Sequence, residues 1–547
     1  MAGPGSMSGS HRAPAGQGAA RMLPKPQGGK AATMVLFENI LLLVLVAILV
    51  LQFSRRLVVP YPAVLATAGV AVAALPSAPE IAIDPQLALA LFIAPALLDS
   101  AFDMPPRDIR RFWMPLVALA VVAVVLTTAA VAWAGVAWAG LPLAAAVALG
   151  ALVAPPDAAA AAAMLGRLAL PRSTVTVLKA ESLFNDAASL LLFTAALEVV
   201  MAPEQSLSAV LLRLAPAAPG GILLGIGLGW IHIRLSARLA GTLGGTLFEF
   251  VATFGTWIIA ERLHLSAILA VVAFGMTVAQ LIPGRRSAGD RVHSYSVWEV
   301  AVFVLNVLAF FLIGLQAREI ARRMPPERFW ETLGVALGVL AVVILVRVAW
   351  VLLYNRAINS TARLRALSGA PSLRQGVVVS WCGMRGLVTL AAALALPADF
   401  PQRDLILMSA LVVVLGTLVL QGLTLRPLIR WLGFAPDESF GREITQARTA
   451  LIDAALAGLE GERDEAAEEL RGEYRAAREV AAAGRHPRAV RRIDALRREG
   501  IAAKRRRLAE LRNAGTIGED VFQALEQELD WAELAASPPG RFEIVEG

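Results

Sequence analysis

The sequence predicts an all-α integral membrane protein of about thirteen transmembrane helices, followed by a helical C-terminal domain. Three observations support this fold class. Of the 547 residues, 57% are hydrophobic and 17% are charged, whereas soluble domains have about 45–50% apolar and about 25% charged residues. The apolar residues gather in runs of about 18–25, the length that crosses a hydrocarbon core. The composition changes near residue 436, where charged residues become frequent.

The N-terminal segment 1–33 is rich in Gly, Ala, Pro and Ser and contains no apolar run, so we expect a disordered extension. The sequence leaves open whether this extension belongs to the native chain. The formal net charge of +7 does not call for a nucleic-acid partner, because most arginines stand between apolar runs and in the tail. The single cysteine, Cys382, excludes an intrachain disulfide.

The apolar runs are expected to be helices, because a helix satisfies its own backbone hydrogen bonds in lipid. They lie at about 35–53, 58–75, 85–102, 113–139, 143–165, 174–201, 207–232, 243–261, 264–283, 295–317, 330–355, 375–397 and 404–431.

Arginine is concentrated in alternate loops, and such loops stay in the cytoplasm. This pattern places the N-terminus outside and the C-terminus in the cytoplasm of a cell membrane. The arginines at 318–328 stand on the opposite side and run against the pattern.

Several charged residues fall inside the apolar runs, where an ionised side chain costs at least about 2.5–3.5 kcal/mol. They are Asp99, Asp157, Glu181, Asp186 and Arg385. A cost of this size marks them as candidates for function.

The segment 181–186 places two carboxylates, an amide and a hydroxyl on one helix. Residues four apart share a helix face, so Glu181 lies above Asn185 and Ser182 above Asp186. Hard cations prefer such oxygen ligands. The alternative is a helix end with Ser182 as a cap. That alternative suits Glu181, which is near a loop, but not Asp186.

Two spans are interrupted at their middles. Pro155 and Pro156 precede Asp157, and proline breaks a helix because it lacks the backbone N–H. A simple kink with Asp157 as a helix cap is an alternative that is compatible with ion binding. In the second half, Gly383 and Gly386 flank Arg385 and weaken that helix.

Broken spans at equivalent places of two halves indicate inverted repeats and a transporter binding site between them. A buried arginine needs a carboxylate partner. Glu181 is the expected partner of Arg385.

Four segments together resemble the sodium/proton antiporters of the monovalent cation:proton antiporter family, and specifically the electroneutral Asn-Asp type. They are L-L-D-S-A-F at 97–102, E-S-L-F-N-D at 181–186, S-V-W-E-V-A-V-F-V-L-N at 296–306 and W-C-G-M-R-G-L-V-T-L at 381–390. The resemblance covers roughly residues 35–435.

The resemblance implies a homodimer in lipid, with dimerisation and core subdomains within 34–435 and two crossed discontinuous helices. It implies alternating access, without cofactor or enzymatic reaction, in which Asp186 binds a monovalent cation or a proton in turn. The remaining roles that it implies are a cation site shared with Asp157 and Ser182, Asn185 beside it, Asp99 near the ion path, and Glu181 with Arg385 as a structural ion pair.

The chain departs from the family pattern at Pro156, Cys382 and Asp99, where the family usually has a small residue such as Thr, a Gly and a Glu. Sodium is the expected cation, with potassium or lithium left open. A membrane sensor without transport is a remote alternative. An intramembrane aspartyl protease is another, but its G-x-G-D signature is absent.

The tail at 436–547 is expected to be a soluble, cytoplasmic, helical regulatory domain. Its arginine-rich stretch could contact anionic lipid, or it could be a solvated helix face. The residues concerned are Arg488, Arg491, Arg492, Arg497 and Arg498.

Overall fold

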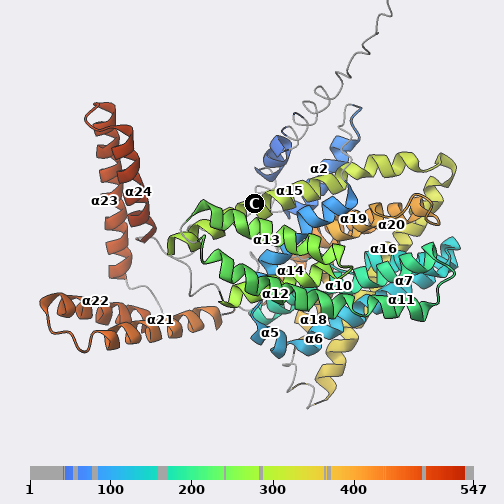
Figure 1. Cartoon of the computed structure of the whole chain (residues 1–547), viewed down its shortest axis with the longest axis horizontal. Coiled ribbons are helices and arrows are strands. Elements are labelled where there is room, and N and C mark those ends of the chain that lie inside the picture. Colours follow the sequence, from blue (N-terminus) through green and yellow to red (C-terminus); the bar gives the residue numbers. More distant parts are fainter. Residues whose placement is uncertain are drawn as a thin grey trace, which may run out of the picture.

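The structure is a computed structural model of the chain. It describes residues 38, 41, 44–52, 60–76, 84–157, 160, 170–239, 242–281, 288–361, 365, 371–434, 437, 439–482 and 488–535. Within these ranges the regular structure is helical, without strands (Figure 1). The expected extension 1–33 lies outside the described residues, and the expected first span is described only in part.

Seven helical runs among the described residues are long and apolar enough to cross a membrane. They are Pro85–Phe102, Trp113–Ala139, Arg172–Met201, Leu207–Ser236, Gly289–Arg323, Pro326–Ser360 and Arg403–Leu432. Shorter apolar helices occupy other expected spans, at Tyr61–Ala73, Leu143–Val153 and Ala267–Leu281. The helical, multi-pass architecture is therefore confirmed, whereas the count of thirteen stays a prediction.

One group of helices packs mainly within itself and is called the flanking bundle. Its members are α2 (Tyr61–Ala73), α3 (Pro85–Ala88), η1 (Leu89–Ile93), α4 (Ala94–Phe102), α12 (Ala217–Ser236), α13 (Leu243–Arg262), α14 (Ala267–Leu281) and α15 (Ala288–Arg323). The closest packing joins α12 to α14 and α2 to α15. α11 (Leu207–Leu214) leads into α12.

A second group is called the core bundle. Its members are α6 (Trp113–Val117), η2 (Ala118–Val122), α7 (Ala123–Ala139), α8 (Leu143–Val153), α10 (Arg172–Met201), α16 (Pro326–Ser360), α18 (Leu373–Trp381), α19 (Leu387–Leu394) and α20 (Arg403–Leu432). Here α8 packs against α7 and α10, and α16 against α7 and α20. The short helix α5 (Pro106–Arg111) connects the two bundles along the chain.

The crossing of α2 with α15 brings two backbones into contact through glycine. A Cβ added to Gly69 would lie 2.3 Å from the carbonyl oxygen of Phe311, and one added to Gly314 would lie 2.1 Å from that of Ala66. Small residues permit such approaches between helices in lipid. Any side chain at either position would force the helices apart.

Both expected helix breaks are present in the core bundle. α8 ends at Val153 and residues 154–157 are not helical, which fits the prolines at 155 and 156. α18 ends at Trp381 and α19 begins at Leu387. The continuation of the first broken span is described only at residue 160.

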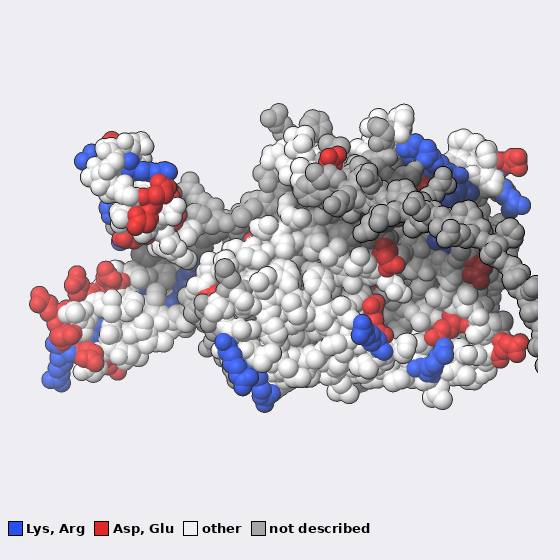
Figure 2. Space-filling view, turned by 45° about the horizontal axis from the view of Figure 1, so that its top comes forward, with Lys and Arg blue, Asp and Glu red and all other residues white. Residues whose placement is uncertain are grey.

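The tail forms two helical hairpins, α21 (Ser439–Gly458) with α22 (Glu465–Ala482) and α23 (Arg488–Asn513) with α24 (Glu519–Ala535). In Figure 1 the hairpins extend away from the two bundles, with α21 starting beside them. In Figure 2 charged side chains crowd onto these hairpins, while the visible bundle surface is largely uncharged. The tail is helical, as expected, but its existence as a separate cytoplasmic domain, its regulatory role and its lipid contacts stay predictions.

Candidate ion-binding site

The two broken segments contact each other through Asp157. Its backbone N–H donates to the carbonyl of Met384 at 2.7 Å. Its carboxylate accepts from the N–H of Ala160 at 3.1 Å and from that of Leu387 at 3.2 Å. Helix starts expose unpaired N–H groups and carry partial positive charge. One carboxylate therefore caps both α19 and the continuation of the first broken span, which fulfils the cap expected at Asp157.

Gly386 makes room for this double cap. A Cβ at that position would lie 1.5 Å from a carboxylate oxygen of Asp157 and 2.8 Å from its Cβ. The side chain of Asp157 thus occupies the space that any other residue at 386 would fill. The glycine expected to weaken the helix also admits the aspartate.

Arg385 donates hydrogen bonds to the free carbonyls at the C-terminal ends of the broken helices. Its guanidinium donates to the carbonyls of Val153 at 3.0 Å and Ala154 at 3.1 Å, and also to that of Gly383. Its backbone N–H donates to the hydroxyl of Thr417 at 2.9 Å. Ends of helices expose carbonyls and carry partial negative charge, which a buried cation compensates.

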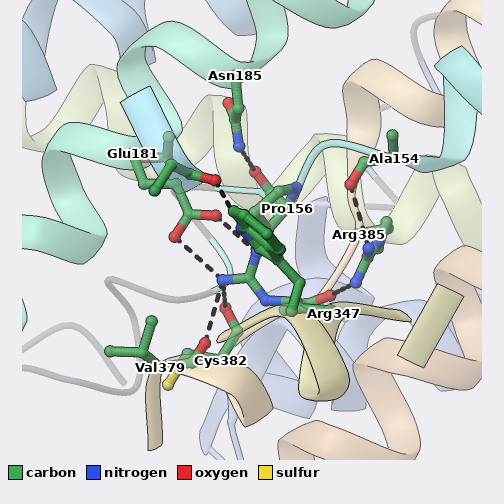
Figure 3. Close-up of polar contacts among 12 residues, drawn as sticks. Ala154, Pro156, Glu181, Asn185, Arg347, Val379, Cys382 and Arg385 are labelled. Carbon is green, nitrogen blue, oxygen red and sulfur yellow. Dashed lines mark hydrogen bonds and ion pairs between the residues drawn. The ribbon is translucent and has the colours of Figure 1, made fainter. Parts of the chain in front are cut away.

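The ion-pair partner of Glu181 is Arg347 on α16, so the expected pairing with Arg385 is wrong. The two carboxylate oxygens of Glu181 accept from Arg347 at 2.6 and 3.0 Å (Figure 3). Both side chains are at most 2% exposed. Arg385 is engaged by the carbonyls of the breaks instead. The bidentate geometry is the strong form of this interaction.

Arg347 also ties the ion pair to the second break. Its guanidinium donates to the carbonyl of Val379 at 3.1 Å. The sequence contained a signal for this residue, because Arg347 is a charged residue in the middle of the apolar run 330–355. The same criterion selected the other buried charges.

Asn185 and its neighbours fasten α10 to the first break. The amide of Asn185 donates to the carbonyl of Pro156 at 2.9 Å (Figure 3). Ser189, one turn further, donates to the carbonyl of Ala151 at 2.7 Å. Pro156, which departs from the family pattern, therefore contributes a backbone oxygen that Asn185 already engages.

Asp186 lies on the same face of α10 as Ser182 and is 5% exposed. Among the described residues, none donates a hydrogen bond to the Asp186 carboxylate or forms an ion pair with it. A buried ionised carboxylate without a partner is strongly unfavourable. A proton or a cation is needed to neutralise it.

Two other expected site residues have different surroundings. The hydroxyl of Ser182 donates to the carbonyl of Lys179 at 2.8 Å, which leaves its oxygen lone pairs able to accept or coordinate. Asp99 lies exposed on α4, which packs against α10. Its place near the ion path stays a prediction.

The tail contacts the start of α10. Asp437 accepts from the backbone N–H of Arg172 at 2.8 Å and from that of Ser439 at 2.9 Å. The bond from Arg172, followed by those from Ser439, lowers the pKa of the Asp437 carboxyl to about 2. Arg172 also pairs with Glu443 on α21. An acid from the tail therefore caps the helix that carries Glu181, Asn185 and Asp186.

Facing helix breaks around buried carboxylates, within a multi-pass helical protein, define the class of ion-transporting membrane proteins. The model of the sodium/hydrogen exchanger transmembrane family matches residues 40–431. The chain belongs to this family and is a cation/proton antiporter.

Two relatives align with this chain over most of its length. A sodium/proton exchanger of Mycobacterium tuberculosis, named as uncharacterised, is 29% identical over 79% of this chain and 81% of its own length. The sodium, potassium, lithium and rubidium/proton antiporter of Bacillus subtilis is 27% identical over 92% of this chain and 79% of its own.

A solved structure supports the fold. The sodium/proton antiporter MjNhaP1 of Methanocaldococcus jannaschii superposes with a TM-score of 0.58 at 18% identity. The match covers 74% of this chain and 100% of that one.

Proposed function

We propose that this antiporter exchanges one sodium ion for one proton across the cell membrane by alternating access, with Asp186 binding either ion in turn. The observation that carries the proposal is the buried carboxylate of Asp186, about four turns inside α10, for which the described residues provide no hydrogen-bond or ion-pair partner. A carboxylate that must be neutral when buried binds a proton or a cation, but not both at once. This mutual exclusion couples the two fluxes.

The charges around the crossing support a one-to-one exchange. Glu181 and Arg347 cancel each other as an ion pair. Asp157 and Arg385 carry opposite charges on the two kinds of helix end. Asp186 is then left with one negative charge, which one monovalent cation or one proton neutralises. The cation would take further oxygens from Ser182 and Asp157.

The two bundles suggest which parts move. Each packs mainly within itself, so the core bundle can shift as a unit against the flanking bundle. In this proposal the flanking bundle forms the homodimer interface, and the core carries the crossing between the two sides of the membrane. The N-terminus lies outside and the tail lies in the cytoplasm.

Sodium is the first candidate because the mycobacterial relative is named as a sodium/proton exchanger. Potassium is the second, because the printed name of the Bacillus subtilis relative includes potassium, lithium and rubidium. Carboxylate and hydroxyl oxygens suit each of these ions, so measurement must separate them. The sensor alternative requires that no cation moves protons.

Proteoliposomes with an imposed pH gradient test the proposal. Sodium, potassium and lithium salts are added in turn to wild type, Asp186→Asn and the control Glu327→Gln, whose exposed carboxylate lies in the first turn of α16. Wild type and the control should collapse the gradient with the transported cation, and Asp186→Asn should not. Full exchange by Asp186→Asn would contradict the role of Asp186. No response of wild type to any cation between pH 6 and 9 would favour the sensor.

A further inference from the structure

Lys179 occupies the approach to the proposed ion site along α10. It precedes Ser182 by three residues and Asp186 by seven, so all three lie on one helix face. Seven residues of α-helix rise about 10 Å. The ammonium is therefore the basic group nearest to Asp186 on this face of α10, along which a cation would approach.

The ammonium of Lys179 is held by a carboxylate from the other bundle. Its Nζ lies 3.2 Å from Oδ2 of Asp103, which is the residue directly after α4. The two side chains are 39% and 64% exposed, so the pair stands at an aqueous edge. Lys179 belongs to the core bundle and Asp103 to the flanking bundle. A shift of the core must stretch or break this contact.

We propose that Lys179 and Asp103 form a gate on the tail side of the protein, which controls cation access to Asp186; this inference rests on the proposed function. While the pair is closed, Asp103 compensates the ammonium and a monovalent cation can reach Asp186. When the core shifts, the pair opens and the ammonium alone faces the path. The exposed charge then opposes return of a cation toward the tail side.

The two residues of the gate carry opposite charges, so removing either charge should change the apparent KM in opposite directions. Lys179→Gln removes the positive charge and leaves Asp103 unpaired, so the apparent KM for the cation should fall. Asp103→Asn leaves the ammonium uncompensated, so the apparent KM should rise. Coulomb's law gives a change of about 2- to 15-fold for a unit charge about 10 Å away, at effective dielectric constants between about 80 and 20. Lys179→Arg keeps the charge and should keep the KM.

The experiment uses the full chain in proteoliposomes with the tail side facing outward, and it titrates the cation that wild type exchanges. The titration is made at alkaline pH, where proton competition is weak. The matched control is Arg478→Gln with Asp453→Asn, which removes an exposed ion pair of 2.6 Å from the tail hairpin. The control should leave KM and kcat unchanged.

Shifts of KM in opposite directions, with kcat changing less, support the gate. Shifts in the same direction, or a loss of kcat alone at unchanged KM, would show a structural contact and overturn it. Unchanged kinetics in both single variants would overturn it as well. Failure of wild type to exchange any cation would instead remove the proposed function.

Discussion

Two helix crossings in this protein bring backbones into contact by opposite means. Where α2 crosses α15, Gly69 and Gly314 have no side chains, and the two backbones lie directly against each other. Where the two broken spans meet, Asp157 and Arg385 satisfy helix ends that face each other. The first crossing uses complete helices, whose backbone groups are hydrogen-bonded within each helix. The second gives up helical hydrogen bonds and must replace each one.

The two crossings differ in the ligands that they can offer to an ion. A close-packed glycine crossing holds helices together but offers no ligands. A broken crossing places carbonyls, amides and ionised side chains in the membrane, which lipid tolerates only when they are buried in protein. The flanking bundle has the first kind, and the core bundle adds the second kind to a glycine contact of its own, that of Gly150 on α8 with the Thr128 carbonyl on α7. The proposed ion chemistry is thereby assigned to the core bundle.

The sharpest test of this division compares two glycine-to-alanine variants. Gly386→Ala should abolish exchange, because the added Cβ would displace the Asp157 carboxylate from both helix starts. Gly314→Ala should lower the melting temperature, since overpacking costs about 1–3 kcal/mol, yet folded molecules should keep exchanging. Thermal melting in detergent and exchange per folded molecule check both. Equal loss of exchange in the two variants would contradict the division.

A second test concerns the buried ion pair. Glu181→Gln or Arg347→Met alone should destabilise the protein by about 3–5 kcal/mol, because each single variant leaves the other member of the pair as an uncompensated buried charge. The double variant should cost clearly less than the sum of the single ones. Melting of the four proteins measures this coupling. Additive losses would mean that the two side chains do not depend on each other.

The smallest effect is expected at Asp437, an exposed acid that caps a helix as the buried Asp157 does. Asp437 caps α10 from the tail, and Asp437→Asn should raise amide hydrogen exchange at residues 172–174 by about two- to five-fold, as for a solvent-screened interaction. The lowered pKa of about 2 means that its stabilising charge is complete above the usual pKa and is lost only as the pH falls toward 2. The pH profile of cation exchange between pH 6 and 9 should therefore match wild type. A shifted profile would assign Asp437 a role beyond capping.

The sequence predicted the breaks well because proline and glycine act locally. Pro155, Pro156, Gly383 and Gly386 mark both breaks without any knowledge of neighbouring helices. Likewise, the polar stripe of α10 follows from helix periodicity alone. These features depend on short stretches of chain.

The pairing of charges could not be predicted in the same way. Glu181 can pair with either Arg347 or Arg385 as far as the sequence shows. In the structure α16 brings Arg347 to Glu181, while Arg385 donates to the carbonyls of Val153 and Ala154. The double cap by Asp157 likewise requires Leu387, 230 residues away. Such contacts belong to the arrangement of helices, which periodicity does not fix.

The anchoring of Arg385 has a consequence for membrane voltage. Its guanidinium is bonded to carbonyls of both broken segments, so its positive charge must move wherever the core moves. In the proposed cycle, the buried charges at the crossing of a loaded core sum to zero, and the membrane potential does no work on them. The crossing of an empty core would carry one negative charge, that of Asp186, and moving one elementary charge through 100 mV involves about 2.3 kcal/mol. The electric field thus acts on the unloaded core alone, and it hinders the empty core in one of its two directions.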